Sequence, residues 1–235
     1  MTKFKRTVSL LIVSIGISLG LAACHSGKYE KSDSVEQRII FPQYSVVYDD
    51  ETQNTTVTAV FSVNNPAGKS LCLSESSAIN CNGETMYGKY DSEAKQYVYS
   101  HQFDEKFIDI ILFEYTNNKG QIFRNDVAVN KFNLSVNQLT ISKSANIAYI
   151  NFNGKPLTDD ETIELYLGSN DEMISLVSQG NRLVISGEQF KDIAEGVYDG
   201  IFVRTLLSSD IQSLDRGGSI SAQYKTKKIK ISITA

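Results

Sequence analysis

Apolar and polar residues alternate with a period of two through most of this chain, and this restricts the fold to one built from β-strands. Residues 55–63 show the pattern most clearly, with Val57, Ala59, Phe61 and Val63 alternating with Thr56, Thr58 and Ser62. Successive side chains of a strand point to opposite faces, so the pattern predicts one buried and one solvent-facing side. Such segments recur about every ten residues and are separated by turn residues, which is typical of β-sandwiches.

The pattern predicts about a dozen strands and almost no helix. The predicted strands are residues 44–48, 55–63, 95–103, 107–115, 121–129, 132–142, 145–152, 162–167, 172–177, 183–186, 197–207 and 220–233. Residues 107–115 are nearly continuously apolar, which predicts a central strand buried on both faces. Only residues 187–195 are predicted to be helical. A sandwich takes about 100 residues, so we predict an all-β chain with two tandem sandwiches, residues 39–131 and 132–235.

One local pattern indicates the type of sandwich. A short strand at 183–186, a helical turn and a strand beginning Gly196-Val197-Tyr198 resemble the E strand, connection and F strand of an immunoglobulin-like domain. The resemblance covers about 25 residues, and it implies that the Tyr198 hydroxyl bonds back to the connection as a tyrosine corner. The core Cys and Trp of antibody domains are absent. The alternative is that Tyr198 is an ordinary half-buried strand tyrosine.

The N-terminus carries an export signal. Lys3, Lys5 and Arg6 precede an apolar run over residues 8–21, which is too short for a comfortable transmembrane helix. The following Leu21-Ala22-Ala23-Cys24 resembles the lipobox of a bacterial lipoprotein. The resemblance implies cleavage of residues 1–23 as a signal peptide between Ala23 and Cys24, and diacylglycerol on the Cys24 sulfur. The alternative is an ordinary signal peptide with a chance cysteine at its cleavage site.

Residues 24–38 are predicted to be the lipidated cysteine and a flexible tether, because they are polar and have little to bury. His25, rather than Asp, follows Cys24, and the lipoprotein resemblance then implies an outer-membrane location, facing the periplasm or the cell surface. Cleavage removes three basic residues and no acidic one, so the formal net charge changes from −4 to −7. An acidic chain has no general attraction to nucleic acid, so we expect membrane attachment through the lipid.

Two cysteines remain in the mature chain. Cys72 and Cys81 are near each other in sequence, and an exported chain matures under oxidising conditions, which favours a disulfide between them. The alternative is a pair of buried thiols.

No pattern of catalytic residues is present. The histidines are His25, in the predicted tether, and His101, at a predicted strand end. The sequence lacks nucleophile, zinc and phosphate-binding motifs, so we predict no enzyme activity, no metal site and no cofactor beyond the lipid. Acidic clusters at predicted turns, such as residues 49–51 and 159–161, leave calcium as an alternative. The solvated-turn interpretation is favoured because the spacing of a calcium loop is missing.

A group of tyrosines is the candidate recognition surface: Tyr87, Tyr90, Tyr97 and Tyr99. Tyrosine makes rigid contacts that are both apolar and polar, which suits binding. Half-buried strand tyrosines are the alternative. Residues 225–231 form a basic run, interpreted as lysines that protect an edge strand from aggregation, or else as a contact for an anionic partner.

These observations favour a membrane-anchored, non-enzymatic binding or adhesion module for a protein or glycan. The alternatives are a periplasm-facing accessory subunit of an envelope complex and, less favoured, a hydrolase or a hydrolase inhibitor. Fold alone does not separate them.

Overall fold

The computed structural model of the chain describes residues 27–145, 147–168 and 172–235, and nearly all their regular structure is β-strand. The helices in these ranges are three short 3-10 turns: η1 (Ser32–Ser34), η2 (Gln37–Ile39) and η3 (Gly187–Phe190). The prediction of an all-β chain with sandwich-like sheets is confirmed. None of the helices in these ranges has the length and apolar character needed to cross a membrane.

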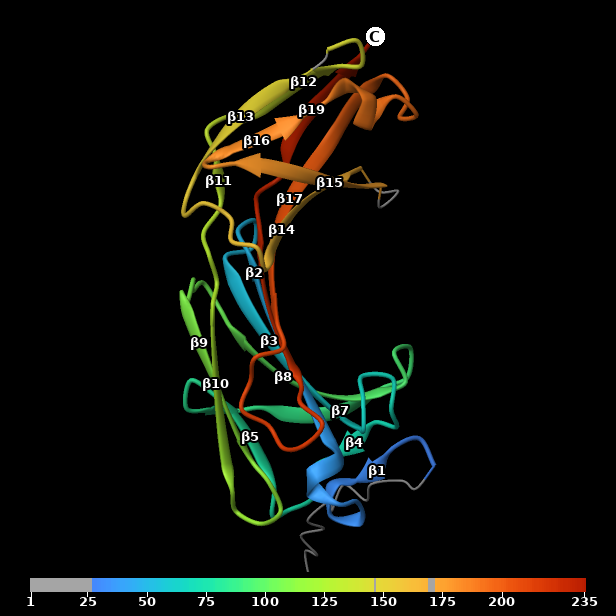
Figure 1. Ribbon diagram of the computed structural model, residues 1–235, viewed down its shortest axis with the longest axis vertical. Coiled ribbons are helices and arrows are strands. Elements are labelled where there is room, and N and C mark those ends of the chain that lie inside the picture. Colours follow the sequence, from blue (N-terminus) through green and yellow to red (C-terminus); the bar gives the residue numbers. More distant parts are fainter. Residues whose placement is uncertain (1–26, 146, 169–171) are drawn as a thin grey trace, which may run out of the picture.

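One sheet of 13 strands runs through both halves of the molecule (Figure 1). Its lower part in the figure contains β18 (Ser219–Lys225), β2 (Ile40–Asp49), β3 (Asn54–Val63), β8 (Gln96–Phe103) and β7 (Tyr87–Asp91). Its upper part contains β17 (Gly196–Ser208), β14 (Glu161–Leu167), β15 (Glu172–Gln179), β16 (Arg182–Ile185), β13 (Ala148–Asn153) and β11 (Asn133–Leu134). The N-terminal part of β17 pairs with β19 (Ile229–Thr234), which also pairs with β12 (Gln138–Ser142).

A second sheet closes the lower half into a sandwich. Its strands are β10 (Ile122–Ala128), β9 (Ile110–Thr116), β5 (Ala78–Cys81) and β6 (Glu84–Thr85). Aromatic rings join the two sheets: Tyr44 stacks on Phe113 with ring centroids 4.8 Å apart, and Phe61 lies 4.6 Å from Tyr115. Beside this sandwich, β1 (Glu30–Lys31) pairs with β4 (Leu71–Cys72).

The prediction that residues 107–115 form a strand buried on both faces is wrong. In β9 only Ile111, Phe113 and Tyr115 are buried, whereas the side chains between them are partly exposed. The residue pattern was misleading because Leu112 is apolar although it lies on the solvent side.

β18 connects the two halves. It pairs antiparallel with β17 and parallel with β2, so strands from before and after the predicted boundary at residues 131 and 132 share one sheet. The basic run at its C-terminal end therefore does not protect an edge, because β18 and β19 each have a neighbour on both sides. Strand order depends on contacts between distant segments, which is why the sequence pattern could not supply it.

Local predictions around β17 are confirmed. The Tyr198 hydroxyl donates to the Ala194 carbonyl oxygen at 2.7 Å, as expected for a tyrosine corner. The preceding turn, η3, is capped by Ser186, whose side chain accepts from the Glu188 amide, while the Gln189 side chain accepts from the Ser186 amide.

A buried ion pair lies where the two halves meet. Arg204 of β17 donates from Nε and Nη2 to the two carboxylate oxygens of Glu161, at 2.8 and 2.7 Å. The same guanidinium donates to the carbonyl oxygens of Lys155 and Pro156, and the Asn130 side chain donates to Glu161. The pair therefore ties β14, β17, the 154–158 loop and the connection between the halves together.

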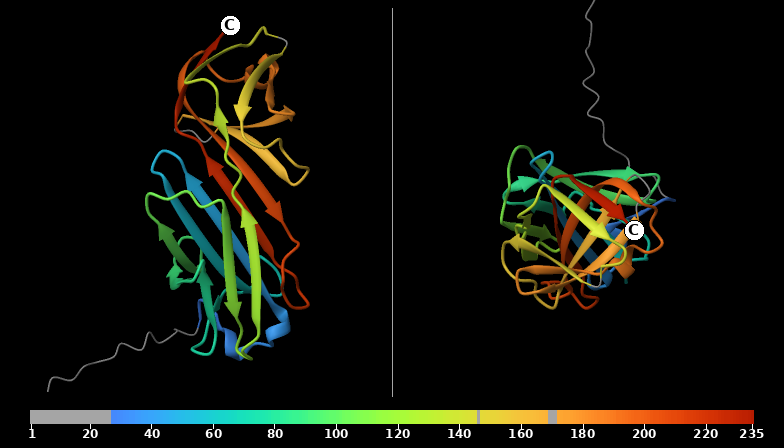
Figure 2. Two further views of the ribbon diagram at one scale, coloured as in Figure 1. Left: turned by 90° about the vertical axis from the view of Figure 1, so that its left-hand side faces the viewer. Right: turned by 90° about the horizontal axis from the view of Figure 1, so that it is seen from above.

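The sheet is curved along the long axis of the molecule (Figures 1 and 2). In Figure 1 the second sheet lies on the outer, convex side of the lower half, and one face of the long sheet is left open on the concave side. β1 lies at the lower end and the C-terminus at the opposite end.

Candidate binding surface

The concave face of the curved sheet is here called the open face, and it carries two rows of uncharged, mostly polar side chains. Strand register defines each row, because residues paired across neighbouring strands point to the same side. The first row is Ser221, Ser45, Thr58 and Ser100 on β18, β2, β3 and β8. The second row is Thr205, Gln223, Val47, Thr56 and Gln102 on β17, β18, β2, β3 and β8.

These two rows contain no charged residue. Large side chains flank the first row instead: Leu207 pairs with Ser221 at one end, and Tyr87 pairs with Ser100 at the other. Tyr87 is 76% exposed. Apart from Val47, the two rows are therefore a neutral strip of hydroxyl and amide groups with an exposed aromatic ring at one end.

The convex face of the same sandwich has a different chemistry. Arg124 of β10 pairs with Glu114 of β9 at 2.8 Å, and Asp126 follows on the same side of β10. Charged side chains are the usual covering of a solvent-exposed sheet, so the neutral rows of the open face differ from the sheet behind them.

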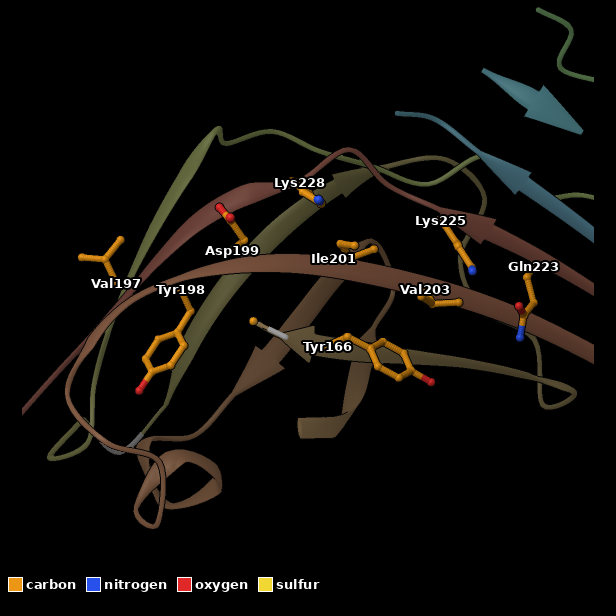
Figure 3. Close-up of a pocket in the computed structure, with 10 residues that line it drawn as sticks. Tyr166, Val197, Tyr198, Asp199, Ile201, Val203, Gln223, Lys225 and Lys228 are labelled. Atoms are coloured by element: carbon orange, nitrogen blue, oxygen red, sulfur yellow. The ribbon is translucent and has the colours of Figure 1, made fainter. Parts of the chain in front are cut away.

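Two depressions follow the open face, and Lys225 lines both. One, of about 440 Å³, lies over β2 and β3 and is lined by Ser45, Thr56, Thr58 and Gln102 among others. The other, of about 720 Å³, lies over β14 and β17 (Figure 3) and is lined by Tyr166, Tyr198, Ile201, Val203 and Gln223 among others. The two depressions meet at Lys225, one over strands of the lower half and the other mainly over strands of the upper half, and they are here called the groove.

Charges lie at the borders of the groove and are partly compensated. Lys225 is paired in register with Asp49, which also lines the smaller depression. Asp199, at the border of the larger one, forms an ion pair with Lys230 at 2.6 Å. The hydrogen bond from Lys230 holds the pKa of the Asp199 carboxyl below its ordinary value.

The structure separates the four predicted recognition tyrosines. Tyr99 is only 7% exposed, and its hydroxyl accepts a hydrogen bond from the Leu73 amide at 2.6 Å, so Tyr99 is part of the hydrophobic core. Tyr97 donates to the Gly88 carbonyl, and Tyr90 lies beside it, in register. Tyr87 projects from the other face of β7 and belongs to the open face.

Residues from the N-terminal segment, which sequence analysis assigned to a tether, pack on these tyrosines. The Tyr29 ring lies 5.0 Å from Tyr97 and 5.5 Å from Tyr90, and the Lys28 ammonium lies 5.2 Å from the centre of the Tyr90 ring. Further along, the Ser32 hydroxyl donates to Asn118 at 2.9 Å. The fold therefore includes the later part of the predicted tether.

Cys72 and Cys81 are both buried, and the structure shows two thiols in place of the predicted disulfide. Cys72 lies on β4, where its thiol donates to the Leu73 carbonyl, whereas Cys81 lies on β5 in the second sheet. Burial raises the pKa of the Cys81 thiol to about 12. Proximity in sequence was misleading because the two cysteines belong to different sheets.

Within the described residues, no group of three or more His, Cys, Asp or Glu side chains is arranged to hold a metal ion. His101 lies on β8 with its ring 4.6 Å from that of Phe103, which is a packing contact. Glu161, assigned by sequence to a solvated acidic turn, is instead buried in its ion pair with Arg204. The predicted lipobox (Leu21, Ala22, Ala23 and Cys24) and His25 lie outside the described residues.

Sequence reasoning did not identify the open face. The polar side of residues 55–63 had indicated that Thr56 and Thr58 would be solvent-facing. Which serines and glutamines stand beside them depends on the order β17-β18-β2-β3-β8, and no local pattern carries that information.

The chain matches no protein-family model and no curated protein. Among solved structures it is similar to the ectodomain of mouse nectin-like molecule 4, with 11% identity, 82% of this chain and 64% of that chain covered, and a TM-score of 0.24. It is also similar to a 1.5-MDa bacterial ice-binding adhesin, with 12% identity, coverage of 85% and 66%, and a TM-score of 0.20. A third is SGBP-B of the Bacteroides ovatus mixed-linkage glucan utilization locus, in complex with a mixed-linkage heptasaccharide, with 10% identity, coverage of 73% and 53%, and a TM-score of 0.17. The chain spans less than two thirds of the first of these.

Proposed function

We propose that this chain is a lipid-anchored, non-enzymatic binding module of a bacterial cell envelope, and that the open face is its binding surface. The observation that carries the proposal is the groove along the curved sheet, whose two rows of uncharged, mostly polar side chains contrast with the charged convex face. A rigid sheet that exposes polar side chains in fixed register provides many weak contacts without ordering a loop.

The position of the N-terminal segment fits the anchor. Only two residues separate Cys24 from Gly27, the first described residue, and β1 lies at one end of the long axis (Figure 1). A lipid on Cys24 would hold this end against the membrane, and the open face would extend away from it.

Metabolic labelling tests the anchor. Cells given radioactive palmitate should label the wild-type protein in the membrane fraction, because acyl chains on Cys24 supply the membrane affinity. The Cys24→Ser variant should be unlabelled and should leave that fraction. Equal labelling of both proteins would contradict lipidation at Cys24.

Charge placed on the open face tests the binding surface. Beads carrying the full chain would be challenged with immobilised fibronectin, collagen, mucin, and neutral and anionic polysaccharides. The Ser45→Lys/Thr58→Lys variant should lose whatever binding the wild type shows, because two ammonium groups would occupy the centre of the first row. The matched Asn80→Lys/Thr116→Lys variant carries the same charge on the convex sheet and should retain binding. Equal behaviour of the two variants, or no binding by the wild type, would contradict the proposal.

A further inference from the structure

We propose that the ligand of the open face is an uncharged polysaccharide, bound as an extended chain that crosses the strands. This inference rests on the proposed function of the open face and specifies its ligand class. It follows from three properties of the open face: its hydrogen-bonding groups, the length of its rows and the absence of charge within those rows.

The hydrogen-bonding groups match a polyhydroxyl ligand. Each Ser or Thr hydroxyl both donates and accepts, and each Gln side chain offers a carbonyl oxygen and an NH₂ group. Sugar hydroxyls have the same dual character. Ser45, Thr58 and Ser100 present such groups on adjacent strands in a single row.

The length of the row fits a chain rather than a single sugar. The first row runs from Leu207 on β17 to Tyr87 on β7, across five strand-to-strand steps. With neighbouring strands about 4.8 Å apart, the row is about 24 Å long. The second row runs beside it, so several consecutive sugars would meet hydroxyl or amide groups.

Aromatic rings lie at the β7 end of the first row and in the larger depression. Tyr87 is exposed at the β7 end, and Tyr166 lines the larger depression over β14. A tyrosine ring offers an apolar face on which the C–H side of a sugar ring can pack, with a polar hydroxyl at its edge. The Tyr166 hydroxyl donates to Glu164 at 2.8 Å, which helps to fix the ring.

Charge argues against an anionic ligand. The two rows are neutral, so an anionic chain lying along them would meet no cation, and the lysines at the borders of the groove, Lys225 and Lys228, are accompanied by Asp49 and Asp199. A protein partner is also disfavoured, because the centre of the first row lacks the aromatic, Met and Arg side chains that dominate protein interfaces. An uncharged polyhydroxyl chain is the ligand that these residues fit best.

Affinity electrophoresis tests this inference. The purified full chain, in neutral detergent, would migrate through native gels containing dextran, laminarin, xyloglucan or galactomannan, with alginate and heparin as anionic probes. We expect retardation by at least one neutral polysaccharide, and the dissociation constant should be the same at 0.05 and 0.5 M salt because no charge is involved.

Three variants locate the site. Thr58→Lys should weaken binding about tenfold or more, because it removes hydrogen bonds and crowds the row. Tyr87→Ala should weaken it about threefold to tenfold through loss of ring contact, and its exposed position leaves folding intact. Thr116→Lys, on the convex sheet, should bind like the wild type, and thermal melting of each variant confirms folding.

The contrary outcomes are distinct. Failure of every neutral polysaccharide to retard the wild type overturns the inference. If the bead assay shows binding to a matrix protein or an anionic polysaccharide that Ser45→Lys/Thr58→Lys abolishes, the proposed function stands and only the ligand class is wrong. If the neutral ligand binds but Thr58→Lys and Thr116→Lys behave alike, the open face is not the site.

Discussion

At the scale of single residues, the Glu161–Arg204 pair is the group whose energetics most affect the fold. The side chains are 1% and 2% exposed, and each is further hydrogen-bonded by surrounding groups. Burial by itself raises the pKa of Glu161, but hydrogen bonds from Arg204, Thr158 and Asn130 and the Arg204 charge outweigh it, so the pKa is lower than usual. The pair fixes the junction over which the groove runs.

Removing one partner of this pair should destabilise the protein strongly. We expect Arg204→Met to lower the free energy of unfolding by about 3–5 kcal/mol, because a carboxylate would remain buried without its counter-charge. Urea unfolding followed by tyrosine fluorescence measures this. The control Arg124→Met breaks the exposed pair with Glu114 and should cost less than about 1 kcal/mol. Equal losses would show that the buried pair has no special role.

The contribution of Glu161 should depend on pH. A carboxyl with a lowered pKa in the folded state stabilises the protein above its unfolded-state pKa, and this stability is lost as the pH falls through the folded-state pKa. The stability difference between the wild type and Glu161→Gln should therefore be constant near neutrality and shrink in acid, because protonated Glu161 resembles Gln. A difference that grows as the pH falls would contradict the lowered pKa.

At the scale of elements, β17 sets the shape of the groove. Its N-terminal part pairs with β19 and its C-terminal part with β18, so one strand of 13 residues belongs to both halves. The tyrosine corner at its start fixes the approach of the preceding turn through the Tyr198 hydroxyl.

Loss of the corner hydrogen bond should have a modest effect. Tyr198→Phe should destabilise the protein by about 0.5–1.5 kcal/mol, the usual net contribution of such a bond. Tyr149→Phe, at a 52% exposed position, is the matched control and should change stability little. The urea unfolding midpoints of the two variants measure this loss of stability. Indistinguishable midpoints would refute a structural role for the tyrosine corner.

Sequence predicted elements better than their arrangement. The alternation over residues 55–63 predicts the bounds of β3 to within one residue, and the pattern over residues 197–207 predicts those of β17 equally well. Both predictions succeed because alternation and flanking turns are local properties of the sequence. The predicted strand at 220–233 is two strands, β18 and β19, separated at the buried Thr226. The disulfide prediction is wrong and the open face was not predicted, because both depend on which distant strands pair.

At the scale of the whole molecule, the shared sheet should make the two halves unfold together. β18 lies between β17 and β2, and the Tyr48 and Tyr224 rings, 5.1 Å apart, pack β2 against β18. Differential scanning calorimetry should show one transition whose calorimetric and van't Hoff enthalpies agree. Two separated transitions would mean that the halves are independent.

The central claim is that ligand binds the open face, and threonine methyl NMR tests it most directly. With ¹³C-methyl threonine and a soluble fragment of the neutral polysaccharide that binds best, the Thr56, Thr58 and Thr205 signals should shift on titration. Thr85 and Thr116, on the convex sheet, should not shift. Shifts confined to Thr85 and Thr116, or none at Thr56 and Thr58 when the protein is saturated, would contradict the account.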